Sequence, residues 1–388
     1  MQWWRLWRGN EVCVHGMLCH SWHALSFRAK RGISVGTDAD ETEIPRFARN
    51  NKTEMVGTVK RTPRKSDLSR LLTEQPNPAA ADLDLKPSLE LARVINREDA
   101  KVAAAVRKAL PQVARAIDLA ASALQRGGRL IYVGAGTSGR IAALDASECP
   151  PTFNTDPRTV QYVMAGGPKA LGAAVEASED SRELGEQEIA KRNPGKNDVV
   201  VGIAASGRTP FTIAAVQYAR KRGAKTIALV CNHGSPLEKA AHLAIVAEVG
   251  PEVVSGSTRM KAGTAQKMVL NMLSTGTMTR LGYVYGNLMV NVHLKNEKLT
   301  ERAASILQRA AGVTKDVALQ ALKDAGGLPV ALVMLQAGVS RAEAATALKG
   351  ARGHVRRAIA AARKSLRGTS QPFGRAVFAR SGGKTPLK

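Results

Sequence analysis

The sequence predicts an α/β fold: a doubly wound parallel five-stranded sheet flanked by helices, followed by a small C-terminal helical domain. Three observations carry this prediction. Short apolar runs typical of buried strands alternate with helical patterns through the middle of the chain. Loops rich in glycine and hydroxyl groups follow several of these runs directly. After Asn296 the apolar spacing becomes helical throughout.

The individual elements follow from hydrophobic periodicity. Between Leu89 and Gln125 apolar residues recur at helical spacing, so one or two long helices are expected before the sheet. Strands are expected at about 129–134, 159–165, 198–204, 225–231 and 243–248. Helices separate the first four strands and a short helix precedes the last, which favours parallel pairing. A long helix is expected from Thr258 to Leu281.

The last part of the chain predicts a small helical bundle at 313–365. Short helical segments there are broken by Gly326-Gly327 and by Gly338-Val339-Ser340. The apolar residues that would form its core are Leu319, Leu322, Val330, Leu332, Leu335, Ala344 and Leu348. Packing or support of a dimer is the role expected of this bundle.

The first glycine-rich loop is typical of a phosphate cradle. The apolar run Leu130–Val133 leads into Gly-Ala-Gly-Thr-Ser-Gly-Arg at 134–140. Glycines let the backbone approach a ligand, hydroxyls donate hydrogen bonds, and a helix N-terminus supplies free N–H groups. The next expected strand does not end in the acidic residue that would bind a ribose, so a dinucleotide site is disfavoured. Glu148 follows, ahead of the stop expected at Pro150-Pro151, and is interpreted as lying close to this loop.

Two further loops strengthen the phosphate interpretation. Ser206-Gly207-Arg208 follows the apolar strand that begins near 198, with Thr209 suited to a helix N-cap and Pro210 to the first helical turn. The segment Ser255–Thr258 precedes the next helix in the same way. Ordinary helix capping explains any one of these loops. Three of them in one α/β segment favour a shared sugar-phosphate site.

Six motifs, taken in order, resemble those of the N-acetylmuramic acid 6-phosphate etherases, a family of sugar isomerase (SIS) domain enzymes. The motifs are GAGTSGR, DASECPPT, EDSRE, VGIAASGRTP, GSTRMKAGTAQK and NEKL. The resemblance runs from about Leu71 to about Ser365, and the motifs are long and specific. It implies a sugar-phosphate domain at 65–295, with its SIS core at about 120–283. It also implies a helical domain of the ubiquitin-associated-like (UBA-like) kind at 296–365.

The resemblance implies cleavage of the D-lactyl ether of N-acetylmuramic acid 6-phosphate to N-acetylglucosamine 6-phosphate and D-lactate, in amino-sugar catabolism and peptidoglycan recycling. Ring opening makes the C2 proton acidic, so elimination and hydration need two acid–base groups and no metal or cofactor. The resemblance assigns these roles to Glu148, as proton donor, and to Glu179. The expected substrate-binding residues are Gly136, Thr137, Ser138, Ser206, Gly207, Arg208, Thr209, Ser257, Thr258 and Lys261.

Other interpretations stay open at this point. A helix carrying Glu179 together with Glu176, Asp180 and Glu183 would be an ordinary solvated acidic face. A non-catalytic, sugar-phosphate-sensing regulator resembling the glucokinase regulatory protein is opposed by room for one SIS domain and by the presence of both glutamates. An aldose–ketose isomerase is opposed by the segment Asp-Ala-Ser-Glu-Cys-Pro-Pro.

Composition sets the remaining expectations. A net charge of +25 is compatible with nucleic-acid binding. No nucleic-acid module is visible, so the expected partners are a small sugar phosphate and a second copy of the chain. The expected dimer contacts are the helix Thr258–Leu281 and the loop near Asn287. No apolar run is long enough to span a membrane, and no signal peptide is visible. Four cysteines without metal or disulfide spacing suit a reducing compartment, so a cytoplasmic location is expected.

The two ends of the chain are expected to lie outside the fold. Residues 1–64 are interpreted as a disordered or spurious extension, because all four tryptophans fall within the first 22 residues and no periodicity persists there. One hypothesis is that translation starts at Met55. The basic tail at 366–388 is rich in glycine, serine and proline and is expected to be disordered.

Overall fold

The computed structural model describes residues 71–368 except 174, 293 and 295, and the structural statements below concern these residues. The predictions for 1–64 lie outside the described residues. The same holds for the predicted tail, apart from its first three residues, which belong to the last turn of α13 (Val355–Gly368).

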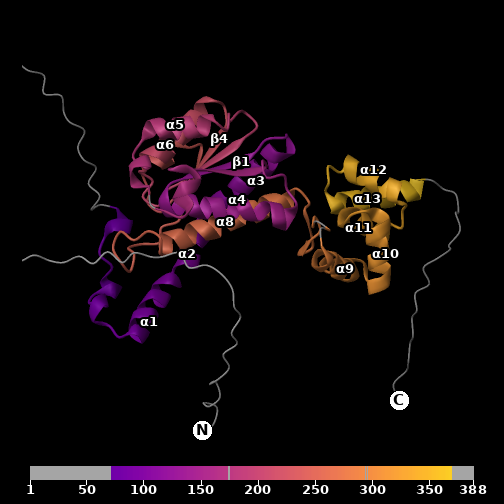
Figure 1. Cartoon of the computed structure of the whole chain (residues 1–388), viewed down its shortest axis with the longest axis horizontal. Coiled ribbons are helices and arrows are strands. Elements are labelled where there is room, and N and C mark those ends of the chain that lie inside the picture. Colours follow the sequence, from indigo (N-terminus) through magenta and orange to yellow (C-terminus); the bar gives the residue numbers. More distant parts are fainter. Residues whose placement is uncertain (1–70, 174, 293, 295, 369–388) are drawn as a thin grey trace, which may run out of the picture. The chain divides into compact units, whose positions relative to one another are not determined.

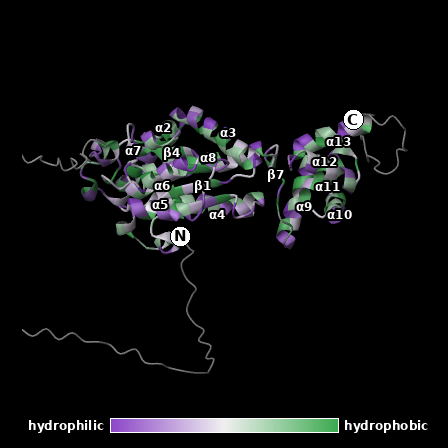
Figure 2. Cartoon of the chain, turned by 90° about the horizontal axis from the view of Figure 1, so that it is seen from above, coloured by the Kyte–Doolittle hydropathy of each residue, from purple (hydrophilic) through white to green (hydrophobic). Residues whose placement is uncertain are grey.

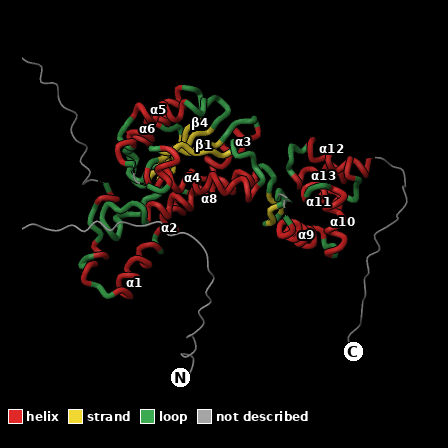
Figure 3. The backbone as a smooth tube through the Cα atoms, in the orientation of Figure 1, coloured by secondary structure: helices red, strands yellow, loops and turns green. Residues whose placement is uncertain are grey.

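A parallel five-stranded sheet organises the first part of the described chain (Figure 1, Figure 3). Its strands are β1 (Leu130–Gly134), β2 (Val160–Met164), β3 (Val199–Ile203), β4 (Lys225–Val230) and β5 (Leu243–Val246). They lie in the order β2-β1-β3-β4-β5, and every neighbouring pair is parallel. The predicted doubly wound sheet is confirmed, with each strand one or two residues shorter than expected.

Helices cover both faces of the sheet because side chains alternate along each strand. Leu130 and Tyr132 of β1 pack into the larger core on one face, whereas Ile131 and Val133 pack into a second core on the other face. The first face is covered by α3 (Leu110–Gln125), α4 (Gly136–Phe153) and α8 (Lys261–Arg280), and the second by α5 (Arg182–Ala190), α6 (Pro210–Lys221) and α7 (Pro236–Ala240). Figure 1 shows these two helical layers with β1 and β4 between them.

Three helices precede the sheet where one or two were expected. They are α1 (Ser88–Asp99), α2 (Val102–Lys108) and α3. Pro111 is the second residue of α3 and has no N–H to donate to the preceding turn, so α2 ends before it and a new helix begins. Short 3₁₀ turns come before α1, at Leu72–Glu74, Pro78–Ala80 and Leu83–Leu85.

Two helix boundaries differ from the prediction. The helix α4 does not stop at Pro150-Pro151 but continues to Phe153. Proline has a helical φ and lacks only its N–H, so two prolines in the last turn leave only two carbonyl groups without helical donors. The helix α8 begins at Lys261 rather than at Thr258. The reason is that the buried carboxylate of Glu252 accepts the N–H groups of Lys261 and Ala262, at 3.0 and 2.9 Å, and so caps the helix there.

The C-terminal region is helical and has a core of its own, as predicted. After the hairpin of β6 (Val284–Tyr285) and β7 (Leu288–Met289) come α9 (Glu297–Ala311), α10 (Lys315–Ala325), α11 (Leu328–Ala337), α12 (Arg341–Gly350) and α13. Gly326 and Gly338 end α10 and α11 in the left-handed conformation, which confirms the two predicted breaks. The hydroxyl of Ser340 accepts the N–H of Glu343 and starts α12.

Figure 2 shows that α9 to α13 carry both apolar and hydrophilic residues, as helices around a small core do. In the described part of the chain, no single helix has the length and apolar composition to cross a membrane. The helices α10 and α11 satisfy those two conditions only as a pair, with a bend of 116° between them. Ala318, Leu322 and Leu332 of this pair are buried in the helical core.

Candidate active site

The predicted loops gather at the carboxyl edge of the sheet. The first follows β1, the second follows β3 and the third lies between β5 and α8. In the strand order β2-β1-β3-β4-β5, the chain leaves β1 toward one side and returns to pair β3 on the other. Doubly wound sheets bind ligands at such a switch point, where the loops after two neighbouring strands diverge. The first and second loops flank this point.

Glu179 lies between the first and second loops. A Cβ placed on Gly136 would lie 2.9 Å from the Glu179 Oε1, so the carboxylate rests against the first turn of α4. The Glu179 carbonyl accepts the N–H of Phe211, at the start of α6, at 3.1 Å. Glu179 is half-buried in a turn before α5, so its interpretation as part of a solvated acidic helix is wrong. Gly136 has a φ of +52° and no side chain, which leaves room for the carboxylate.

The second loop presents polar groups around the start of α6. The hydroxyl of Ser206 accepts the N–H of Arg208 at 3.2 Å. Thr209 is the N-cap residue, as predicted, but its hydroxyl makes no capping hydrogen bond. The Arg208 Nε is buried without a partner in the described part of the chain. Gly207 has a φ of +66°, and a Cβ there would collide with the Ser235 side chain, so only glycine fits this turn.

The first loop meets α8. Ser138 is buried, and its hydroxyl donates to the Gln266 Oε1 at 3.0 Å. A Cβ on Gly263 would lie 3.5 Å from the Thr137 methyl group and 3.6 Å from the Thr258 carbonyl oxygen. The third loop is therefore next to the first, and both meet the N-terminal turns of α8.

Lys261 is placed differently from its sequence-based assignment. It is 1% exposed, and its Nζ lies 2.6 Å from the Glu98 Oε2 on α1. Burial alone would raise the pKa of Glu98, but hydrogen bonds from Lys101, Lys261 and Asn77 lower that pKa to about 2. In this arrangement the Lys261 ammonium ties α8 to α1. The sequence motif indicated a cation here but not its partner, which lies 163 residues away.

A short N-terminal segment, which the sequence analysis did not assign to the site, also reaches the loops. Thr73 is buried, its hydroxyl accepts from Asn232 at 3.2 Å, and its carbonyl accepts the Gly256 N–H at 3.3 Å. A Cβ on Gly256 would lie 2.9 Å from the Glu74 Oε2. Thr73 thus links the end of β4 to the third loop. The only sequence signal for it was that the family resemblance begins near Leu71.

Glu148 lies far from the first loop along α4, contrary to the interpretation drawn from the sequence. It is twelve residues after Gly136 in one continuous helix, which separates the two by about 18 Å along the axis. Glu148 is exposed on an outer stripe of α4 with Leu144, Ser147 and Pro151. Closeness in sequence did not become closeness in space because the intervening residues are helical.

A buried polar cluster holds this end of α4. The Asp145 carboxylate accepts from the Tyr132 hydroxyl at 2.9 Å, from the Asn271 Nδ2 at 2.7 Å and from the Ser274 hydroxyl at 3.0 Å. Burial raises the pKa of Asp145 although these three hydrogen bonds lower it. Asp145 and Glu148 are one helical turn apart, so the cluster also limits the movement of the backbone that carries Glu148.

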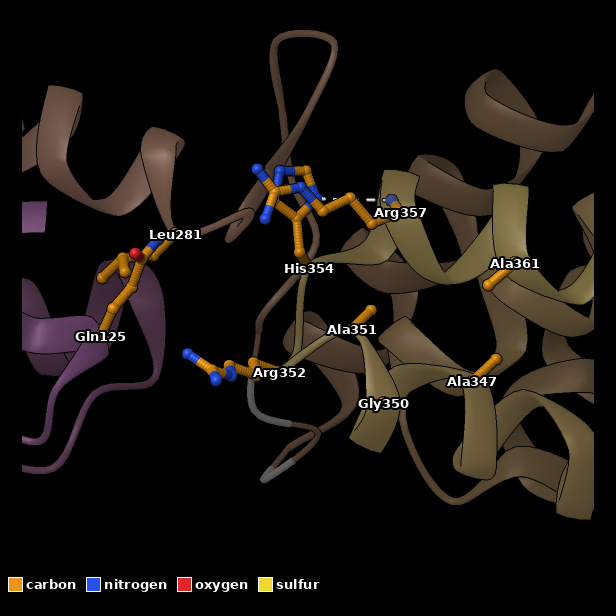
Figure 4. Close-up of a pocket in the computed structure, with 9 residues that line it drawn as sticks. All are labelled: Gln125, Leu281, Ala347, Gly350, Ala351, Arg352, His354, Arg357 and Ala361. Atoms are coloured by element: carbon orange, nitrogen blue, oxygen red, sulfur yellow. Dashed lines mark hydrogen bonds between the residues drawn. The ribbon is translucent and has the colours of Figure 1, made fainter. Parts of the chain in front are cut away.

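A separate cavity of about 560 Å³ contains none of the predicted site residues (Figure 4). It is lined by Gln125, Leu281, Ala347, Gly350, Ala351, Arg352, His354, Arg357 and Ala361. Burial and the charges of Arg357 and Arg356 lower the pKa of His354. The cavity therefore has basic surroundings, but it does not adjoin the three loops.

Two family models match segments of the described chain. They match at 112–220, for the N-terminal SIS domain of the glucokinase regulatory protein, and at 186–276, for the SIS domain.

The chain is 51% identical over 290 residues to an N-acetylmuramic acid 6-phosphate etherase of Aeromonas hydrophila, covering 74% of this chain and 97% of the relative. It is 55% identical over 275 residues to an enzyme of the same name from Symbiobacterium thermophilum, covering 70% and 91%. Among solved structures, a phosphoheptose isomerase from Francisella tularensis matches with 20% identity and a TM-score of 0.39, over 50% of this chain and 100% of that chain.

Proposed function

The chain belongs to the N-acetylmuramic acid 6-phosphate etherase family, and we propose that it is a carbon–oxygen lyase that cleaves the D-lactyl ether of N-acetylmuramic acid 6-phosphate. The products are N-acetylglucosamine 6-phosphate and D-lactate, in amino-sugar catabolism and peptidoglycan recycling. About half of the aligned residues are identical to those of etherases, and the alignments cover nearly the full length of these relatives. The structural observation that best supports the proposal is the position of Glu179 at the switch point of the sheet. Its carboxylate lies against Gly136 of the first loop, and its carbonyl accepts the N–H of Phe211 just after the second loop.

We assign the 6-phosphate to the first and second loops. Ser206, Thr209 and Ser138 supply hydroxyl groups, and the first turn of α4 supplies N–H groups that have no helical acceptor. Arg208 adds a positive charge, Gly136 and Gly207 let the backbone come close to the ligand, and Thr137 contributes its N–H from the first turn of α4. Ser257 and Thr258 lie beside the first loop, where they are suited to contact the sugar. Lys261 contributes indirectly, by fixing the third loop through Glu98.

The reaction needs a proton removed at C2 and a proton delivered to the oxygen that leaves C3. In the open-chain sugar, C1 is an aldehyde, which makes the C2 proton acidic. We assign delivery of the proton to the leaving oxygen to Glu148. Glu179 removes the C2 proton or positions the water that adds to the unsaturated aldehyde. Each of these is acid–base work suited to a carboxyl group.

The distance between the two glutamates supports a homodimer with shared sites. From C2 to C6 of the substrate there are four carbon–carbon bonds, which span at most about 6 Å. A sugar whose phosphate sits at the first turn of α4 cannot also reach Glu148 about 18 Å along the same helix. We therefore propose that Glu148 of a partner subunit completes each site. The exposed stripe of Leu144, Ser147, Glu148 and Pro151 then belongs to the interface, together with α8.

Mixed dimers test the function and the shared site together. Glu148→Gln and Glu179→Gln subunits carrying different affinity tags are coexpressed, and the heterodimer is purified through both tags. Release of D-lactate from N-acetylmuramic acid 6-phosphate is then measured. If the two glutamates of a site come from different subunits, one of the two sites is intact and activity is about half that of the wild-type dimer. An inactive heterodimer beside an active wild type would place both glutamates of a site in one subunit.

A non-catalytic sugar-phosphate-sensing regulator is the second candidate, and the match to the glucokinase regulatory protein model is the observation that favours it. That match covers 109 residues, whereas the etherase relatives match over about 290. Tight binding of the substrate without release of lactate would favour the regulator.

A cytoplasmic location stays a proposal. It is supported by Cys149 and Cys231, which are buried free thiols.

A further inference from the structure

The hydrogen bond between Ser138 and Gln266 has a direction that conflicts with phosphate binding. The Ser138 hydroxyl donates its proton to the Gln266 Oε1 at 3.0 Å. A hydroxyl has one proton, so Ser138 then offers only lone pairs to a ligand. A phosphate dianion also offers lone pairs and requires donors. In this arrangement, Ser138 cannot donate to the phosphate assigned to it.

The same hydrogen bond leaves a buried donor unused. Gln266 is 1% exposed, and its Nε2 has no hydrogen-bond partner in the described part of the chain. Its neighbours along α8 at Ala262, Ala265 and Val269 are fully buried and apolar. An amide N–H₂ group in such surroundings costs free energy unless it finds an acceptor. Packing alone would be served as well by an apolar side chain of the same size.

Reversal of one amide group removes the first conflict and gives the buried amide nitrogen an acceptor. Turning the Gln266 amide over exchanges Oε1 with Nε2 and leaves the shape of the side chain unchanged. Nε2 then donates to the Ser138 oxygen, and the Ser138 proton is released toward the N-terminus of α4. The N–H groups of the first turn of α4 converge there, because the first helical bond runs from the Gly139 N–H to the Ala135 carbonyl.

We propose that Gln266 is a positioning residue for the substrate phosphate, which acts by donating to Ser138 so that the Ser138 hydroxyl donates to the phosphate. The inference rests on the proposed function, since it concerns the same phosphate. It makes Gln266 part of the binding apparatus although the side chain is buried between α4 and α8 and does not itself touch the ligand.

Two variants of similar size separate this role from simple packing. Gln266→Met keeps the volume and removes both polar atoms, so the Ser138 hydroxyl is no longer oriented but can still donate. Gln266→Glu offers only acceptors at neutral pH. The Ser138 hydroxyl then donates its hydrogen bond to the new carboxylate, which also adds a negative charge near the phosphate. The substrate KM, kcat and the inhibition constant of inorganic phosphate are measured for each variant, and direct binding of inorganic phosphate is measured by calorimetry.

The two variants should differ in size of effect. Gln266→Met should raise KM and the phosphate constants about three- to tenfold, and Gln266→Glu about 10- to 100-fold, with kcat within about twofold of wild type. The effect of Gln266→Glu should shrink as pH is lowered and the new carboxyl is protonated. In a Ser138→Ala background, Gln266→Met should add nothing, because the hydroxyl that it orients is gone.

Equal effects of the two variants, or an unchanged affinity for inorganic phosphate, would overturn the proposal. So would an additive effect of Gln266→Met in the Ser138→Ala background. If Gln266→Glu does not fold, the comparison of Gln266→Met with the double variant still decides the question. Because phosphate binding is measured without turnover, a protein that binds phosphate in a Gln266-dependent way but releases no lactate would sustain this inference and refute the etherase activity.

Discussion

Two regions along α8, each with a buried carboxyl group at its centre, are held by opposite electrostatic means. At the N-terminal end of α8, beside the phosphate loops, Lys261 forms a buried ion pair with Glu98, whose pKa is lowered to about 2. At the far end of α4, Asp145 is held by hydroxyl and amide donors with no cation in hydrogen-bond contact. Burial raises the pKa of Asp145. One carboxyl is thus stabilised in its charged form, and the other is pushed toward its neutral form.

The difference shows how one helix serves two purposes. In the proposed assignment, the N-terminal end of α4 supplies free N–H groups and the oriented hydroxyl of Ser138 to the substrate phosphate. The C-terminal end carries Glu148 on the surface, with Asp145 fixing the backbone one turn away. If the partner-subunit proposal is correct, each α4 binds the phosphate of its own site and delivers the acid of its partner's site.

The largest expected effect is on the rate of lactate release when Glu148 is replaced. Glu148→Gln should lower lactate release about 10²- to 10⁴-fold, because the amide keeps the shape but cannot deliver a proton to the leaving oxygen. Glu186→Gln, the same change at an exposed glutamate of α5, is the matched control and should keep the wild-type rate.

Uptake of deuterium from solvent at C2, followed by NMR, distinguishes the two glutamates. Loss of this exchange in Glu179→Gln would identify Glu179 as the base, and retained exchange would leave it the role of positioning water. Wild-type lactate release by Glu148→Gln would contradict the assignment and the mechanism.

The ion-paired region should respond strongly to loss of its carboxylate. Glu98→Gln leaves the buried Lys261 ammonium without its charge partner and should lower the free energy of unfolding by about 3–5 kcal/mol at pH 7. The folded-state pKa of Glu98 lies below its unfolded value. Its contribution is therefore present above about pH 4.5 and is lost as the pH falls toward 2. Urea unfolding from pH 3 to pH 7 should show a smaller difference between variant and wild type at the acidic end, and a constant difference would contradict the ion-pair explanation.

The next largest effect is expected on phosphate binding by the second loop. Ser206→Ala should raise KM about 10- to 100-fold while kcat changes much less, because a hydrogen bond to a charged acceptor is lost. Inhibition by inorganic phosphate should weaken in parallel. Ser122→Ala, on the exposed surface of α3, serves as control. Undiminished phosphate inhibition in Ser206→Ala would exclude Ser206 from the site.

The smallest effect is expected at the buried polar cluster around Asp145. Asp145→Asn turns one acceptor into a donor that faces the Tyr132, Asn271 and Ser274 donors, and should cost about 1–3 kcal/mol of stability. The pKa of Asp145 is raised on folding, so its ionisation reduces stability as the pH rises through that raised pKa. The gap between variant and wild type should therefore narrow with rising pH, opposite to the trend at Glu98. A parallel trend in the two variants would remove the contrast between the two regions.

Much of the fold followed from local pattern because strands, loops and helix starts are set by neighbouring residues. The five strands, the N-cap position of Thr209 and the breaks at Gly326 and Gly338 were all predictable in this way. The two helix boundaries that were predicted wrongly depend on contacts from elsewhere in the chain or on the position of a residue within its helix. The start of α8 depends on Glu252, nine residues upstream. The stop expected at Pro150 failed because the last helical turn tolerates proline.

In the candidate site, too, local pattern predicted some features and contacts between distant segments decided the others. The sequence determined that the chain carries three hydroxyl-rich loops after parallel strands, and that these belong to one edge of a sheet, because parallel strands bring their carboxyl ends together. It also determined the family, through motifs made of consecutive residues.

Only the tertiary structure decided which side chains face one another across these elements. It placed Glu179 against Gly136, joined Lys261 to Glu98, brought Thr73 to Asn232 and paired Ser138 with Gln266. It also separated Glu148 from the loop that precedes it. The physical reason is that residue spacing determines position along a helix or strand, whereas burial and hydrogen bonding between distant segments depend on how whole elements pack.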